Sequence, residues 1–295
     1  MIRQPVKIGS ITAEANATKN LTIPVGHKGT ICGLYFMPCN GANPVTDKAV
    51  VLNSVEKLML EVTHQTEGGF AILNDVTPEL LYFRELYYGK TRGMVNEGAI
   101  ITYDPSAAQR GGEAAANMRN LGTADLSDMN LRVTFNGTVT GLTRIDVYAD
   151  IDYNLKANLG VHVRMAHVTA PVAATGGDVE IANLPCVDAR FAYETIFIQE
   201  NSLTNVTVDK TSFVINGSDW KFRDIPRKLF ERLQVEAHRA PQTGFMSYDF
   251  AKEDNPSYFL QGGMAEIKLI PTFKAGTSPK GGNVKVWYEI IRIGK

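Results

Sequence analysis

Six short segments in the first half of the chain recur in the same order in the second half. Thus "LYF" at 34–36 matches "IFI" at 196–198, and "LRVTF" at 131–135 matches "LIPTF" at 269–273. In chain order the six separations are 162, 153, 148 or 149, 145, 138 and 139 residues. Chance matches would scatter, whereas a duplicated unit gives separations that drift slowly. The sequence therefore predicts an internal duplication, with shorter loops in the second copy.

The other four matches follow the same order. They are Leu60 and Val62 with Phe213 and Ile215, "DVTPELLYFREL" at 75–86 with "DIPRKLFERL" at 224–233, "ITYD" at 101–104 with "MSYD" at 246–249, and "IDVYADI" at 145–151 with "VKVWYEI" at 284–290. The second of these matches has the composition of a helix start, with Asp75 or Thr77 as a candidate cap. Its prolines, Pro78 and Pro226, give a separation of 148 and its apolar faces give 149, and the sequence does not decide between them.

Apolar residues alternate with period two over most of the chain, as at Leu58, Leu60 and Val62. Turn residues between these segments leave little room for crossover helices, which favours antiparallel sheets in an all-β sandwich or barrel. Two short helices are expected. Their predicted buried faces are Val76, Leu80, Phe83 and Tyr87 in the first, and Ile225, Leu229 and Leu233, helped by Phe230, in the second.

Composition limits the range of partners. The 30 basic and 31 acidic residues nearly cancel, so we expect no direct specific contact with nucleic acid. Three cysteines, Cys32, Cys39 and Cys186, match no disulfide or zinc spacing and are expected to be reduced, mostly buried thiols. No apolar stretch resembles a signal peptide or a membrane span, so a soluble product without a signal peptide is expected.

Residues that could carry chemistry are few. The five histidines, His27, His64, His162, His167 and His238, show no metal-ligand spacing and are expected to be surface or linker residues. No phosphate-binding loop, dinucleotide fingerprint or nucleophile elbow occurs. We therefore expect that the protein has no catalytic residue, binds no cofactor and is not an enzyme.

Three carboxylates share one face of a predicted strand, those of Asp146, Asp150 and Asp152. Because such a ladder repels itself, either cations or basic neighbours must meet it. A structural calcium site, perhaps between subunits, is one hypothesis, and a solvated or salt-bridged face is the other. Trp220 and Trp287 are candidates for sugar stacking, although core packing is the commoner use.

The order of strands, a helix after proline, more strands, a long loop and paired closing strands, twice over, resembles the double jelly-roll major capsid proteins of tailless icosahedral viruses with an internal membrane. The segments "NLTIPVGHKGTICGLYF" and "FVINGSDWKFRDIPRKLFERL" are similar to those of the corticovirus-type phages. The resemblance covers most of residues 18 to 293. It implies an N-terminal arm over 1–17, a first jelly roll over 18–155, a linker over 156–177 and a second jelly roll over 178–295.

The resemblance also implies a function. Two tandem upright antiparallel jelly-roll β-barrels, each with a short helix, would form a homotrimer with a pseudo-hexagonal outline that tiles an icosahedral shell. The arm would contact neighbours or lipid headgroups, and the Ala-rich loop 104–128 would form a tower or clasp. Implied partners are neighbouring trimers, penton or minor capsid proteins and the internal membrane, in a virion assembled from protein made in the host cytoplasm.

Two other functions fit the same pattern. A carbohydrate-binding or carbohydrate-active protein on two β-sandwiches would need two carboxylates at a fixed separation, which a sequence does not reveal. A minor phage spike protein would also be trimeric but scarce in the particle.

Overall fold

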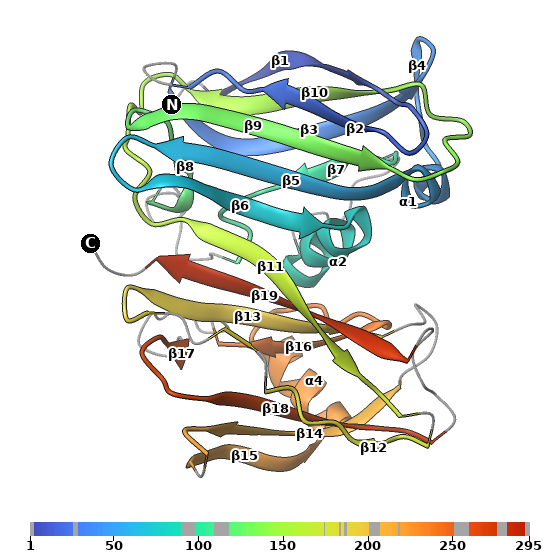
Figure 1. Cartoon of the computed structure of the whole chain (residues 1–295), viewed down its shortest axis with the longest axis vertical. Coiled ribbons are helices and arrows are strands. Elements are labelled where there is room, and N and C mark those ends of the chain that lie inside the picture. The colour runs from blue at the N-terminus through green and yellow to red at the C-terminus, as the bar shows by residue number, and fades with distance from the viewer. Residues whose placement is uncertain are drawn as a thin grey trace. The chain divides into compact units, whose positions relative to one another are not determined.

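The computed structural model describes residues 3–25, 29–89, 98–108, 118–173, 175–182, 184–185, 188–200, 207–217, 219–250, 260–275 and 282–292. The chain divides into two compact units. Unit 1 contains Met1–Leu86 and Lys90–Met165, and unit 2 contains Tyr87–Gly89 and Ala166–Lys295. Each unit is a sandwich of two mostly antiparallel sheets (Figure 1).

Unit 1 has a first sheet built around β3 and a second built around β9 and β5. The first sheet runs β1 (Arg3–Thr12), β10 (Arg144–Asp152), β3 (Thr30–Asn40), with β4 (Asn43–Pro44), β7 (Ile101–Tyr103) and β8 (Leu121–Gly122) also paired to β3. The second runs β2 (Thr18–Thr22), β9 (Leu126–Phe135), β5 (Val55–His64), β6 (Gly68–Val76). Two helices belong here, α1 (Lys48–Ser54) and most of α2 (Pro78–Tyr88).

Unit 2 repeats this order. Its first sheet runs β11 (Val163–Pro171), β19 (Asn283–Arg292), β13 (Phe191–Gln199), β16 (Phe245–Asp249), with β17 (Leu260–Gln261) also on β13. Its second runs β12 (Gly177–Asp178), β18 (Ile267–Phe273), β14 (Val208–Ile215), β15 (Asp219–Pro226), and α4 (Arg227–Glu236) follows. The chain passes from unit 1 to unit 2 inside β11, whose Met165 still forms a parallel bridge with Leu73 of β6 in unit 1.

The core of each unit lies between its two sheets and follows from the period-two pattern. Leu58, Leu60 and Val62 on β5 are at most 1% exposed, while Glu61 between them pairs with Arg132 at the surface. In unit 2, Phe213 and Leu269 hold the corresponding places in the core. Full burial of one such side chain stabilises the fold by about 1.5–3 kcal/mol relative to exposure.

The register of the ladders confirms the duplication. Leu60 lies opposite Leu131 in the β5–β9 ladder, and their repeats Phe213 and Leu269 lie opposite each other in the β14–β18 ladder. The two segments in each copy were matched by different separations, 153 for the first and 138 for the second. Two independent separations that return the same cross-strand partner indicate one fold made twice.

The helices settle the separation that the sequence left open. α2 begins at residue 78 and α4 at residue 227, which are 149 apart. Asp75 and Asp224, also 149 apart, both have a positive φ, 55° and 50°. Each forms an ion pair with a lysine of the neighbouring strand, Lys57 at 3.0 Å and Lys210 at 2.6 Å. The apolar faces therefore gave the right alignment and the prolines did not.

Two of the expected boundaries are wrong. The expected arm over 1–17 holds β1 over residues 3–12, which pairs with β10 along its whole length. The expected linker over 156–177 holds β11 over residues 163–171, which pairs with β19. Each segment is the first strand of its unit and pairs with the closing strand of that unit, β10 or β19.

The Ala-rich loop 104–128 is only partly described, since residues 109–117 lie outside the described ranges. Its described ends pack back on unit 1. Ala107 and Ala108 are at most 1% exposed, and Leu121 in β8 pairs with Ile31 of β3. The prediction of a tower or clasp therefore concerns the middle of this segment alone.

Candidate assembly surface

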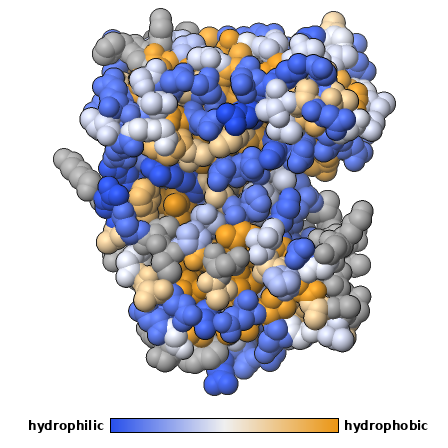
Figure 2. All heavy atoms as spheres, viewed as in Figure 1, coloured by the Kyte–Doolittle hydropathy of each residue, from blue (hydrophilic) through white to orange (hydrophobic). Residues whose placement is uncertain are grey.

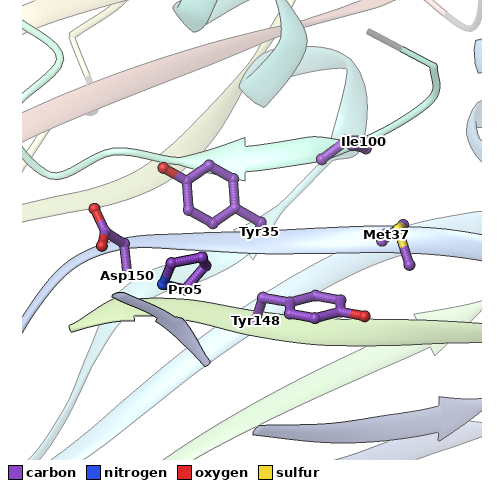
Figure 3. Close-up of a pocket in the computed structure, with 6 residues that line it drawn as sticks. All are labelled: Pro5, Tyr35, Met37, Ile100, Tyr148 and Asp150. Carbon is purple, nitrogen blue, oxygen red and sulfur yellow. The ribbon is translucent and has the colours of Figure 1, made fainter. Parts of the chain in front are cut away.

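A hollow of about 580 Å³ lies on the outward face of the first sheet of unit 1. Six residues line it, shown in Figure 3: Pro5, Tyr35, Met37, Ile100, Tyr148 and Asp150. Val147 and Ala149, which alternate with Tyr148 on β10, are fully buried on the inner face. Strand alternation therefore presents the lining residues outward. We call this depression the β10 hollow.

Cross-strand pairing fixes the positions of the lining residues. Tyr148 lies opposite Tyr35 on β3 on one side and opposite Lys7 on β1 on the other. Pro5 lies opposite Asp150. The Lys7 ammonium stands 6.0 Å from the centroid of the Tyr148 ring. The hollow thus combines aromatic and aliphatic walls with one carboxylate, a composition suited to binding a mixed apolar and basic protein surface.

The phenol of Tyr35 stays neutral at any physiological pH. Its burial raises its pKa above the usual value of 10.0, and the nearby carboxylates of Asp150, Asp104 and Glu85 raise the pKa further. The group therefore remains available as a hydrogen-bond donor inside the β10 hollow.

Asp146 lies on β10 two residues before Tyr148, next to the hollow, and is only 2% exposed. Its carboxylate accepts hydrogen bonds from Ser10 Oγ at 2.6 Å and Arg144 Nε at 2.9 Å, and Lys7 Nζ lies 2.9 Å away. Burial acts to raise its pKa, but the hydrogen bonds from Arg144, Ser10 and Lys7 outweigh burial and hold the pKa well below the usual value. This carboxylate links β1 to β10.

The three aspartates of β10 are not one site. Asp146 and Asp150 are four residues apart on a strand, which separates their Cα atoms by roughly 13 Å. Asp152 is 1% exposed and accepts a hydrogen bond from its own turn, at Asn154 N. The hypothesis of a salt-bridged face therefore holds for Asp146, which meets Lys7 and Arg144, whereas Asp152 does not lie on a solvated face. Within the described ranges no three His, Cys, Asp or Glu residues could hold a metal ion together, and calcium between subunits stays a prediction.

A second depression, of about 400 Å³, lies on the outward face of the other sheet of unit 1. Three of its charged lining residues form ion pairs, Lys57 with Asp75 at 3.0 Å and Arg132 with Glu61 at 2.8 Å, and Glu56 also lines it. Figure 2 shows that the face carrying β2, β9, β5 and β6 is largely hydrophilic, with smaller hydrophobic areas between. Such a face is suited to solvent, and a buried contact there would have to desolvate these ion pairs.

Of the histidines, His162 departs from the expectation of a surface or linker residue. It is fully buried, its Nδ1 lies 2.9 Å from Gly160 O, its Nε2 accepts from Arg164 Nε, and its ring stacks on Phe70 at 5.4 Å. It therefore serves packing in unit 1.

The remaining candidates have structural surroundings. His64 Nε2 lies 2.9 Å from Asp125, and the His167 ring lies 4.6 Å from the Trp287 ring. Trp287 is 1% exposed and donates to Gln199 Oε1, so it is unavailable for sugar stacking. The thiols of Cys32 and Cys39 are buried, and Asn120 Nδ2 lies 3.3 Å from Cys32 Sγ. His27, Cys186 and the side chain of Trp220 lie outside the described residues, and His238 adopts φ 59° just after α4.

A buried polar cluster in unit 2 has no counterpart in the sequence analysis. The last residues of α2 belong to this unit by their contacts. The Tyr88 hydroxyl donates to Glu289 Oε2 at 2.6 Å and lies 2.9 Å from Thr195 Oγ1. Tyr87 donates to Asp249, which also receives Arg239 Nε at 2.6 Å. The near-continuous apolar and aromatic run from 80 to 88 was the available signal, because a helix that is apolar all round is a buried one.

The expected apolar face of α4 is wrong. Leu229 and Leu233 are 49% and 40% exposed, whereas Arg227 and Gln234 are 4% exposed. Burial of Arg227 is possible because Glu200, itself 2% exposed, forms an ion pair with it, and because Arg227 also donates to Phe245 O. Only Phe230 of the expected set packs on the core.

Within the described ranges no helix is long and apolar enough to cross a membrane.

Neither the protein-family models nor the sequences of curated proteins give a match to this chain. Solved structures do. The major capsid protein P2 of bacteriophage PM2 is similar at a TM-score of 0.77 and 12% identity, over 100% of this chain and 98% of that chain. The major capsid protein of Sulfolobus turreted icosahedral virus is similar at 0.63 and 10%, over 99% and 97%.

The similarity extends to a third viral capsid protein. The Faustovirus major capsid protein is similar at a TM-score of 0.50 and 7% identity, over 100% of this chain and 90% of that chain. Identity at this level indicates shared fold, and the shared fold covers both units and nearly the whole length of each relative. The chain therefore has the double jelly-roll fold of the viral major capsid proteins.

Proposed function

We propose that this chain is the major coat protein of an icosahedral virus and that it works by assembly, without a catalysed reaction. The observation that supports the proposal is the similarity to three viral major capsid proteins from end to end, with at least 90% of each relative covered. Both jelly rolls are matched in each of these relatives.

The proposed building block is a homotrimer. Two equivalent jelly rolls in one subunit give six similar blocks about a threefold axis, and six blocks form a pseudo-hexagon that tiles a surface. Each subunit then meets the next through a heterologous contact that closes after three copies. Selection for this outline explains why the order of strands is retained in both units although few residues are identical.

The finer features of the proposal come from the resemblance to tailless phages. The trimers would stand upright in the shell of a virion around an internal membrane, next to penton or minor capsid proteins, after synthesis in the host cytoplasm. No direct specific contact with nucleic acid is proposed, since the basic and acidic residues, 30 and 31, nearly cancel.

Electron microscopy of the purified full chain tests the proposal. Particle averages should show threefold symmetry with six lobes of similar size. Quantitative mass spectrometry of purified virions separates a coat protein from a spike, because the coat protein should be the most abundant species. Averages of a single two-lobed particle, or a minor share of virion protein, would contradict the proposal.

A further inference from the structure

The two helices at equivalent positions differ in what covers them. On α2, Leu80, Phe83, Arg84 and Tyr87 form one side of the helix and each is at most 5% exposed. Their counterparts 149 residues later, Leu229, Arg232, Leu233 and Glu236, form the same side of α4. Leu229 and Leu233 are 49% and 40% exposed, and the side chains of Arg232 and Glu236 are 70% and 54% exposed. We call these four residues the α4 face.

The difference is largest on this side, although Phe230 and Glu231 are also more exposed than their counterparts Leu81 and Tyr82. Leu86 on α2 and Val235 on α4 are also 149 residues apart, and they are exposed in both helices, at 40% and 50%. The α4 face is therefore a surface whose counterpart is buried and which is bare in the single chain.

Contacts within unit 2 show what the end of α2 packs against. The Tyr87 ring stands edge-on to Phe197 of β13, with ring centroids 5.6 Å apart. The Tyr88 hydroxyl donates to Glu289 of β19 at 2.6 Å. In the β13–β19 ladder Glu289 lies opposite Thr195, which also contacts that hydroxyl, and Phe197 is two residues further on. The end of α2 thus binds the outward face of the β13–β19 pair.

In unit 1 the positions equivalent to Phe197 and Glu289 line the β10 hollow. Ladder register makes Tyr35 the counterpart of Phe197, because each lies opposite the matched aromatic residue, Tyr148 or Trp287. Asp150 is likewise the counterpart of Glu289. Tyr35, Tyr148 and Asp150 all line the hollow. Unit 1 therefore carries, in open form, the face that in unit 2 holds the end of a helix.

We propose that the α4 face of one copy docks in the β10 hollow of a second copy of this chain. The inference rests on the proposed function and names the contact that closes the trimer. The occupant is a second copy because both surfaces are exposed in the single chain, Ile100 at the rim of the hollow at 37% and Leu229 at 49%.

The chemistry of the two surfaces is complementary. Leu229 and Leu233 supply apolar area for walls made of Pro5, Met37 and the tyrosine rings. Arg232 supplies a guanidinium for the Asp150 carboxylate, and its present partner Glu236 is on the same exposed side at 2.9 Å. An apolar centre with a charged pair at its rim is the usual anatomy of a specific protein interface.

A disulfide trap tests the contact directly. The full chain carries Leu233→Cys and Ile100→Cys, with Cys186→Ser in all variants so that the remaining native thiols, Cys32 and Cys39, are buried ones. Oxidation of the purified protein should give covalent species of up to three chains, because each copy contributes one cysteine to each of two contacts. Either single-cysteine variant, as control, should give no cross-link through this contact, because its engineered thiol faces an isoleucine or a leucine there.

A second measurement uses the exposed positions of α4. Leu233→Glu should raise the concentration at which the trimer dissociates by roughly tenfold or more, since it places a charge in a buried centre. Val235→Glu, the matched control on the side exposed in both helices, should leave that concentration unchanged. Circular dichroism and the melting temperature should be unchanged in both, because both residues are at the surface.

The outcomes separate the two proposals. A wild-type trimer that gives no cross-link and tolerates Leu233→Glu overturns this contact and leaves the coat-protein function standing. A cross-link formed only within single chains also overturns it. A wild-type monomer contradicts the proposed function itself.

Discussion

Tyr148 on β10 lies directly opposite Tyr35 on β3, and their repeats Trp287 and Phe197 lie opposite each other in the same way. The environments of the two pairs differ. Tyr148 and Tyr35 line an open hollow, whereas Trp287 and Phe197 are at most 1% exposed. The two units thus have the same strand register at these positions, but the aromatic pair is partly exposed in unit 1 and buried in unit 2.

Truncating an aromatic residue of each pair to alanine should reveal this difference in burial as a difference in the free energy of unfolding. Trp287→Ala removes a fully buried indole and its hydrogen bond to Gln199, so the free energy of unfolding should fall by about 3–5 kcal/mol. Tyr148→Ala, at the half-buried counterpart, should cost less than about half of that, because no enclosed cavity remains. Urea titration of both variants measures the difference, and equal losses would show that the two positions are not distinguished by burial.

Asp146 should make stability depend on pH in the acid range. Its pKa in the folded protein is lowered from 3.8, so its contribution is present above about pH 4 and is lost as the pH falls towards the folded value. Asp146→Asn should lower the free energy of unfolding by about 2 kcal/mol near pH 7, because charge-assisted hydrogen bonds are lost. The gap between wild type and variant should narrow below pH 4.

Denaturant titrations at pH 3, 5 and 7 provide the measurement. Asp150→Asn is the control on the same strand, and its effect should be smaller because Asp150 lines an open hollow. A gap between wild type and Asp146→Asn that is the same at pH 3 and pH 7 would contradict the role given to this carboxylate.

Asp75 and Asp224 should be needed more for their backbone than for their charge. Both have a positive φ, which glycine adopts freely and alanine does not, at a cost of about 1–2 kcal/mol. The ion pairs with Lys57 and Lys210 are surface pairs worth about 0–1 kcal/mol. Asp75→Gly and Asp224→Gly should therefore be milder than the matching alanine variants.

Thermal unfolding of the four variants tests this. If alanine and glycine prove equally destabilising at both sites, the ion pairs rather than the backbone conformation would be the reason that aspartate occurs twice.

Much of the fold could be predicted from local pattern and repetition. The alternation at Leu58, Leu60 and Val62 predicted β5, and the drifting separations predicted which strands of the two units correspond. The first strands β1 and β11 escaped detection because they mix polar and apolar residues, so that their pairing with β10 and β19 alone makes them strands. Helix α1 also escaped detection, being a single capped segment after Asp47.

The assembly surface could be predicted less well, for a physical reason. Binary pattern assumes that apolar residues face inward, and α4 reverses this by burying Arg227 against Glu200, which lies 27 residues earlier in the chain. Asp146 is held by Lys7 and Ser10, more than 130 residues away in sequence. No local pattern encodes such partners. The β10 hollow likewise gathers residues from β1, β3 and β10 and from the approach to β7.

The central claim is that duplication of a jelly roll produced a block for a threefold assembly. Light scattering on the purified full chain, separated by size and measured over a range of concentrations, tests this most directly. The predicted result is a stable species of three times the chain mass of 32.3 kDa. A single chain mass maintained at the highest concentration would contradict the account.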